Sequence, residues 1–70
     1  MPTYTCLYIG PSNAVVESSF VVAANSAEAM DRVERALRSR DDLTAIEIWY
    51  EGRMQMRFTL NELASQAGAG

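Results

Sequence analysis

Few side chains in this sequence could carry out catalysis. The chain contains no histidine, which removes the commonest general base and the usual partner of a serine or cysteine nucleophile. Cys6 is the single cysteine, and it falls within a predicted strand, away from a helix N-terminus or basic cluster that would favour its thiolate. We therefore interpret Cys6 as a small buried hydrophobic residue, assign no catalytic residues and expect a protein that is not an enzyme.

Metal and cofactor sites are not indicated either. Asp41 and Asp42 are adjacent acids, but they lack the regular oxygen-ligand spacing of a calcium loop and follow a predicted helix, where turn residues are expected. One thiol without histidine cannot form a structural zinc site, and the spaced glycines and the lysine of nucleotide-binding motifs are missing. We expect no bound metal and no cofactor.

Composition argues against two classes of partner. The 70 residues carry a net charge of −3, and the six basic residues, all arginine, alternate with acids instead of clustering. This pattern disfavours a nucleic-acid or anionic-membrane surface. No run approaches the ~18–20 apolar residues of a membrane span, and the first residues lack the features of a secretory signal. We expect a cytoplasmic protein with no nucleic-acid or membrane partner.

Residues 25–40 form the most clearly predicted helix. Asn25 can cap the first turn, and Glu28 stands three residues later, as in a capping box. The helix should bury one apolar stripe, which consists of Ala29, Met30, Val33, Ala36 and Leu37. Its acids precede arginines by four residues, which explains the charged face as solvated ion pairs.

Two strands with a turn between them precede this helix. Residues 3–9 alternate Tyr4, Cys6 and Tyr8 against Thr5, Leu7 and Ile9, and residues 10–13 are a dense turn signal. An extended run from residue 14 or 15 to residue 24 should complete a hairpin. We expect its core face to be the set that contains the largest side chain, namely Val16, Ser18, Phe20, Val22 and Ala24.

A second hairpin follows the helix. Residues 43–50 alternate Ile46 and Ile48 against Glu47 and Trp49, and residues 53–58 alternate Met54, Met56 and Phe58 against polar residues. A two-residue loop would place apolar residues of one strand opposite polar or charged residues of the other. We therefore expect a three-residue loop at residues 50–52. This register pairs Ile48 with Met54 and Ile46 with Met56, and it sets Trp49 opposite Arg53, within reach of a cation–π contact.

These elements predict the fold class and the domain organisation. The class is α+β, in the order ββαββ, with a four-stranded, mostly antiparallel sheet and one long helix on one face. A second capping signal at Thr59 and Glu62 predicts a short C-terminal helix over residues 60–67. Residues 1–67 should form a single domain and residues 68–70 a flexible tail.

One helix can cover only one side of such a sheet, so the other side should retain apolar residues and meet a partner. The predicted interface residues are Trp49, Arg53, Leu7, Ile9 and Val21. Three occupants are open at this point: the C-terminal helix folded back, a second copy of the chain, or a ligand. A homodimer is the leading interpretation because symmetric dimers are the commonest soluble assembly, and another protein partner remains an alternative.

Short motifs give the chain a resemblance to a known class of proteins. These are the opening Met-Pro-x-Tyr, the helix entry at Asn25, Glu28, Ala29 and Met30, and the run from Ile46 to Arg53 that passes through Trp49 and Gly52. They resemble short uncharacterised bacterial proteins, of the domain-of-unknown-function kind, with a ββαββ pattern over residues 1–58. The resemblance implies a bacterial cytoplasmic origin and no site residues.

The function predicted from these observations is a small non-enzymatic interaction protein that homodimerises through the helix-free face of its sheet. The alternative is a small-molecule sensor or carrier, with a pocket between the sheet and the C-terminal helix. That pocket would be lined by Met54, Met56, Tyr8 and Tyr50.

Overall fold

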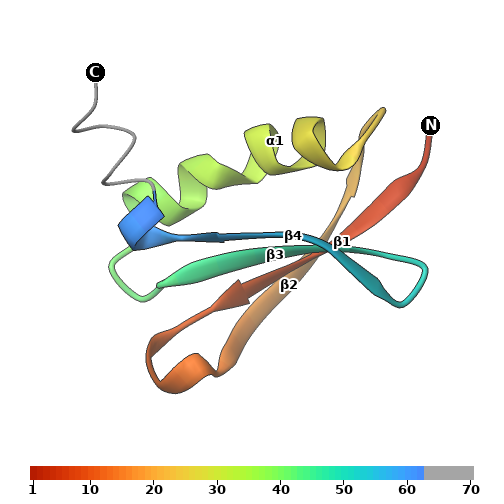
Figure 1. Cartoon of the computed structure of the whole chain (residues 1–70). Coiled ribbons are helices and arrows are strands. Elements are labelled where there is room, and N and C mark those ends of the chain that lie inside the picture. The colour runs from red at the N-terminus through yellow and green to blue at the C-terminus, as the bar shows by residue number, and fades with distance from the viewer. Residues whose placement is uncertain (63–70) are drawn as a thin grey trace.

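A computed structural model describes residues 1–62 of the chain, and it confirms the α+β class and the ββαββ order (Figure 1). The elements are β1 (Thr3–Ile9), the short 3-10 helix η1 (Pro11–Asn13), β2 (Val15–Val22), α1 (Ser26–Ser39), β3 (Ala45–Tyr50) and β4 (Arg53–Thr59). A further helix begins after Thr59, whose hydroxyl accepts the Glu62 N–H at 3.2 Å, and residues 60–62 are helical. The rest of that predicted helix and the predicted tail at 68–70 lie outside the described residues.

The helix α1 starts where its capping residue predicts. Asn25 Oδ1 accepts the backbone N–H of Glu28 at 2.8 Å, which satisfies one of the donors that the first turn leaves free. The Glu28 carboxylate turns outward and accepts from Arg32 Nη2 at 2.9 Å, which forms one of the predicted ion pairs. The apolar stripe is buried as expected, with Ala29, Met30, Val33 and Leu37 facing the sheet.

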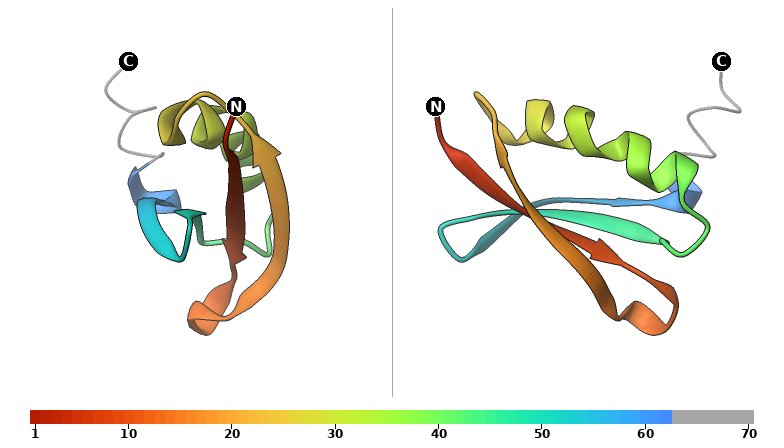
Figure 2. Two further views of the ribbon diagram at one scale, coloured as in Figure 1. Left: turned by 90° about the vertical axis from the view of Figure 1, so that its right-hand side faces the viewer. Right: turned by 180° about the vertical axis from the view of Figure 1, so that it is seen from behind.

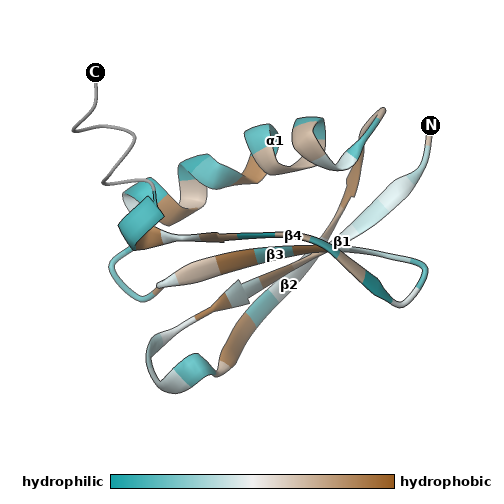
Figure 3. Ribbon diagram, viewed as in Figure 1, coloured by the Kyte–Doolittle hydropathy of each residue, from teal (hydrophilic) through white to brown (hydrophobic). Residues whose placement is uncertain are grey.

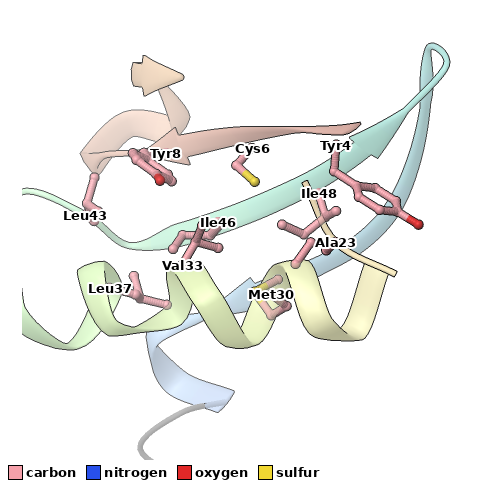
Figure 4. Packing of buried hydrophobic residues seen from close by; sticks show 11 residues of the cluster. Tyr4, Cys6, Tyr8, Ala23, Met30, Val33, Leu37, Leu43, Ile46 and Ile48 are labelled. Carbon is pink, nitrogen blue, oxygen red and sulfur yellow. The ribbon is translucent and has the colours of Figure 1, made fainter. Parts of the chain in front are cut away.

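The sheet is antiparallel throughout, with the strand order β2-β1-β3-β4 (Figure 2). The central strands β1 and β3 come from different hairpins, and α1 lies across one face of the sheet. The core lies between them and includes Cys6, Ile46 and Ile48, none of which has measurable exposed surface (Figure 4). Of the four residues predicted to face the long helix, Ile46, Ile48 and Met56 do so, whereas Met54 does not.

The predicted three-residue loop between β3 and β4 is wrong. Tyr50 pairs directly with Arg53, so the loop has two residues, Glu51 and Gly52. Both have positive φ values, 49° and 78°, as a type I′ turn requires. This turn suits the right-handed twist of the two strands.

A β-bulge resolves the conflict that argued against the two-residue loop. The register shifts at Ile48 and Trp49, because Trp49 pairs with Met54 whereas Ile48 pairs with Met56, which leaves Gln55 as the extra residue. The predicted pairing of Ile48 with Met54 is wrong for this reason. The bulge turns Met54 to the face opposite α1, while Met56 and Phe58 stay on the helix side.

The predicted core face of β2 is also wrong. Phe20 lies opposite Thr5 and is 78% exposed, whereas Val21 lies opposite the buried Tyr4 and packs against the core. Ala23 is fully buried near the start of α1. The strand therefore directs its smaller residues beneath the helix and leaves its largest side chain on the helix-free face.

Candidate interaction surface

The face of the sheet opposite α1, here called the open face, can be described as rows of side chains. Directly opposed residues of an antiparallel sheet point to the same side, so the strand registers define each row. The central row runs across all four strands and contains Phe20, Thr5, Trp49 and Met54. The row beside it contains Ser18, Leu7, Glu47 and Arg57.

The open face is more apolar than the sequence predicts. Phe20 is 78% exposed, Val22 52% and Met54 50%, while Leu7 and Trp49 are half-buried between neighbouring side chains. The ribbon coloured by hydropathy shows hydrophobic segments on β2 as well as on the central strands (Figure 3). Exposed large apolar residues on one sheet face are typical of surfaces that bind a partner.

A hydrogen-bonded network holds the polar part of this face. Trp49 Nε1 donates to Glu47 Oε1 at 2.9 Å, and Arg57 Nη1 donates to Glu47 Oε2 at 2.8 Å. Arg57 Nη2 also donates to Asn13 Oδ1 at 3.2 Å, which ties the η1 turn to β4. The Glu47 side chain is only 13% exposed, so its charge is satisfied by these two donors rather than by bulk water. The network also fixes the orientation of the Trp49 ring.

The five predicted interface residues fall into two groups. Trp49 and Leu7 lie on the open face with part of their surface accessible, and Ile9 belongs to the same face but is only 3% exposed. Val21 is on the helix side, and Arg53 pairs with Tyr50 at the hairpin tip on that same side. The predicted placement of these last two residues on the helix-free face is wrong, because the facing of β2 is reversed and the β4 bulge shifts the register.

Sequence reasoning missed Phe20, Val22 and Met54 as open-face residues. Both faces of β2 carry apolar side chains, so the period-2 pattern alone cannot choose between them. The pairing with β1 decides the facing, because Val21 and not Phe20 lies opposite the buried Tyr4. For Met54, the Glu51-Gly52 turn signal favours a two-residue loop, which by itself places Met54 opposite Trp49 on the open face.

A second polar cluster joins the end of α1 to the edge strand β2. The guanidinium of Arg40 donates to Glu17 Oε1 at 2.7 Å and to both carboxylate oxygens of Asp42, at 3.0 and 2.7 Å. It also lies over the Tyr8 ring, 6.0 Å from the centroid. The hydrogen bonds and charge of Arg40 lower the pKa of Asp42. Asp42, which the sequence predicts to be a turn residue, therefore forms a structural ion pair with Arg40.

In the described part of the chain, the remaining candidate residues do not form a catalytic, metal-binding or pocket arrangement. Cys6 is fully buried, and burial raises the pKa of its thiol, which disfavours the reactive thiolate. Within residues 1–62, no three metal-ligating side chains of the acidic, cysteine or histidine type come together, and no pocket is present. The predicted pocket lining is not assembled, because Met54 points to the open face while Met56, Tyr8 and Tyr50 face α1.

In the described range, α1 is too short and too polar to cross a membrane, and no other helix there could do so. The chain matches no protein-family model, no curated protein and no solved structure. The resemblance to short bacterial ββαββ proteins therefore stays a prediction.

Proposed function

We propose that this chain is a non-enzymatic interaction protein that forms a homodimer through its open face, and that it acts in the cytoplasm. The observation that carries the proposal is the exposure of Phe20, Val22 and Met54 around Trp49, on a face that no helix covers within residues 1–62. Removing such apolar surface from water contributes about 25 cal/mol per Å². A small domain gains proportionally more from this than a large one, because its own core is limited.

The order of residues in the central row suits a two-fold contact. A two-fold axis parallel to the strands, between β1 and β3, would place Phe20 of one copy over Met54 of the other. The same axis would place Trp49 over the small side chain of Thr5. The largest ring of the row then meets its smallest side chain, and a phenyl ring meets a thioether, a contact worth about 0.3–1.5 kcal/mol. The same patch can therefore serve both protomers, as an isologous dimer requires.

The polar network of the open face is compatible with burial in such a contact. Both oxygens of the Glu47 carboxylate already accept hydrogen bonds, one from Trp49 and one from Arg57. A charge that is paired and hydrogen-bonded before association has a smaller free-energy cost of desolvation than a charge that is stabilised by water. Trp49 is also held in a fixed orientation, which reduces the entropy lost when a partner packs against it.

Sedimentation equilibrium at micromolar concentration tests the proposal. The wild-type protein should sediment at no less than twice the 7.7 kDa mass of the chain. Leu7→Lys should lose the open-face contact and sediment at a lower mass than wild type, because the new charge would be buried at that contact, while in the single chain it lies opposite Glu47 and is tolerated. The matched control is Leu60→Lys, which makes the same change at an exposed position outside the two central rows and should remain dimeric.

Two results would reject the proposed dimer. One is a wild-type protein that sediments as a single chain throughout the micromolar range. The other is a Leu7→Lys variant that is folded by circular dichroism and associates as tightly as wild type.

A further inference from the structure

The outer edge of β2 differs from the other edge of the sheet. Within the described residues β2 has only β1 as a neighbour, and it lies on the outer side of β1 (Figure 2). The opposite edge, β4, carries Arg53 and Arg57 and has its bulge at Gln55 in the middle of the strand, whereas the bulge of β2 lies at Val16, before the stretch from Glu17 to Val22. Charges and bulges on an edge strand are devices that prevent pairing with another chain. Along β2 from Glu17 to Val22 the single charge is Glu17 itself, and Arg40 already neutralises it.

The strand register shows which backbone groups of β2 are available at this edge. Ala23 N–H donates to Pro2 O at 3.1 Å, which makes this a hydrogen-bonded pair of the β1–β2 ladder. Hydrogen-bonded pairs recur at every second residue of an antiparallel ladder, so Val21 and Ser19 also direct their N–H and C=O groups to β1. The intervening residues Ser18, Phe20 and Val22 direct theirs to the free edge.

We infer that a second copy of this chain pairs with β2 along this edge, antiparallel, about a two-fold axis at Phe20. Phe20 then pairs with Phe20 of the other copy, and Ser18 pairs with Val22 on either side. Every outward N–H and C=O of these three residues meets a complementary group. The two four-stranded sheets become one continuous sheet of twice that size, and the two exposed Phe20 side chains lie next to each other at the junction.

Charge disfavours the register in which the axis moves along β2 to Ser18. With the axis at Phe20, Glu17 lies opposite Ala23 of the other copy, and the two Glu17 residues are about 20 Å apart along the strands. With the axis at Ser18, the two Glu17 residues would be close diagonal neighbours, and like charges at such positions are destabilising. The register at Phe20 also keeps each Glu17 next to its own Arg40.

This edge contact is independent of the open-face contact proposed above. It uses backbone groups of β2 that point along the sheet, whereas the open-face dimer uses side chains that point away from the sheet. The two axes are different and do not intersect, so the two contacts together would propagate as an open-ended assembly instead of closing into a ring. An experiment that rules out one of these contacts therefore does not rule out the other.

Amide hydrogen exchange followed by NMR tests the edge contact residue by residue. In a dilute sample the amides of Ser18, Phe20 and Val22 should exchange rapidly, while those of Ser19 and Val21 are protected by β1. On raising the concentration into the associated range, the first three should slow by at least about tenfold. This alternation along one strand is specific to edge pairing, because side-chain packing on the open face does not occupy these N–H groups.

A backbone variant provides the matched perturbation. A synthetic chain that is N-methylated at Phe20 retains every side chain and every β1–β2 hydrogen bond, but it loses one outward donor and blocks the edge. It should show no concentration-dependent protection at Ser18 and Val22, whereas Leu7→Lys should keep that protection. If the Phe20 amide of wild type exchanges rapidly in a sample that sediments as a dimer, the edge inference is wrong and the open-face dimer stands. Rapid exchange in a monomeric sample also overturns pairing with a second copy.

Discussion

Replacing Phe20 by alanine should change the stability of the dilute protein very little, although phenylalanine is among the largest apolar residues. Truncation of a core phenylalanine to alanine costs about 3–5 kcal/mol, but Phe20 is 78% exposed, so only about a fifth of that, roughly 0.6–1 kcal/mol, is expected. Ile48→Ala is the matched comparison. Ile48 has no exposed surface, and its truncation should cost about 2–5 kcal/mol of a total stability of roughly 3.5–10 kcal/mol for a chain of this length.

Urea denaturation followed by far-UV circular dichroism measures both values, at a low and a high protein concentration. At low concentration Phe20→Ala should lower the free energy of unfolding by less than about 1 kcal/mol, and Ile48→Ala by at least twice as much. At high concentration the wild-type midpoint should rise, because association stabilises the folded state, and that rise should shrink in Phe20→Ala. A loss above about 2 kcal/mol for Phe20→Ala in the dilute sample would place this ring in the core and refute the facing of β2.

Three further predictions concern the turn, the acidic cluster and the thiol. Glu51→Asn should raise the free energy of unfolding by roughly 0.5–1 kcal/mol in urea titrations, because Glu51 has a φ of 49° and asparagine tolerates this left-handed region far better; an unchanged or lower value would contradict the type I′ assignment. The lowered pKa of Asp42 contributes stability above the ordinary carboxyl pKa of about 3.9, and this contribution is lost as the pH falls through the folded-state value. Asp42→Asn should therefore give a shallower loss of urea midpoint on acidification than wild type, and a parallel loss would show that Arg40 does not act through this carboxylate. Cys6 should react with a chromogenic disulfide reagent only as fast as the protein unfolds, and rapid labelling in native buffer would contradict its burial.

The sequence predicts the helix and all four strands because each has a local signal. Asn25 supplies the cap of α1, and the apolar stripe has the helical period, so the face that α1 buries follows directly. The facing of β2 could not be predicted in the same way, because both of its faces carry apolar residues and the choice depends on which side chains fit beneath α1. The size of Phe20 predicts a place in the core, whereas the structure has it opposite Thr5 on the open face.

The register of the second hairpin failed for a different physical reason. A strict alternation of two residues is a good guide to a regular strand, but the bulge at Gln55 inserts one residue and reverses the facing of Met54. The sequence contains the turn signal at Gly52 and no separate signal for the bulge. The open face was therefore predicted to exist, with Trp49 and Leu7 on it, while several of its apolar residues were assigned to the other side.

The position of β1 beside β3 has a consequence for how the chain acquires its structure during synthesis. Each hairpin is local and can close in about 1–10 μs, but an isolated two-stranded hairpin is marginally stable in water. The pairing of β1 with β3 stabilises both hairpins, and it joins a strand that precedes α1 in the sequence to one that follows it. It therefore cannot form until β3 has left the ribosome. Until then the N-terminal hairpin has no lasting partner, and the apolar residues of β2 are open to chaperones or to neighbouring nascent chains.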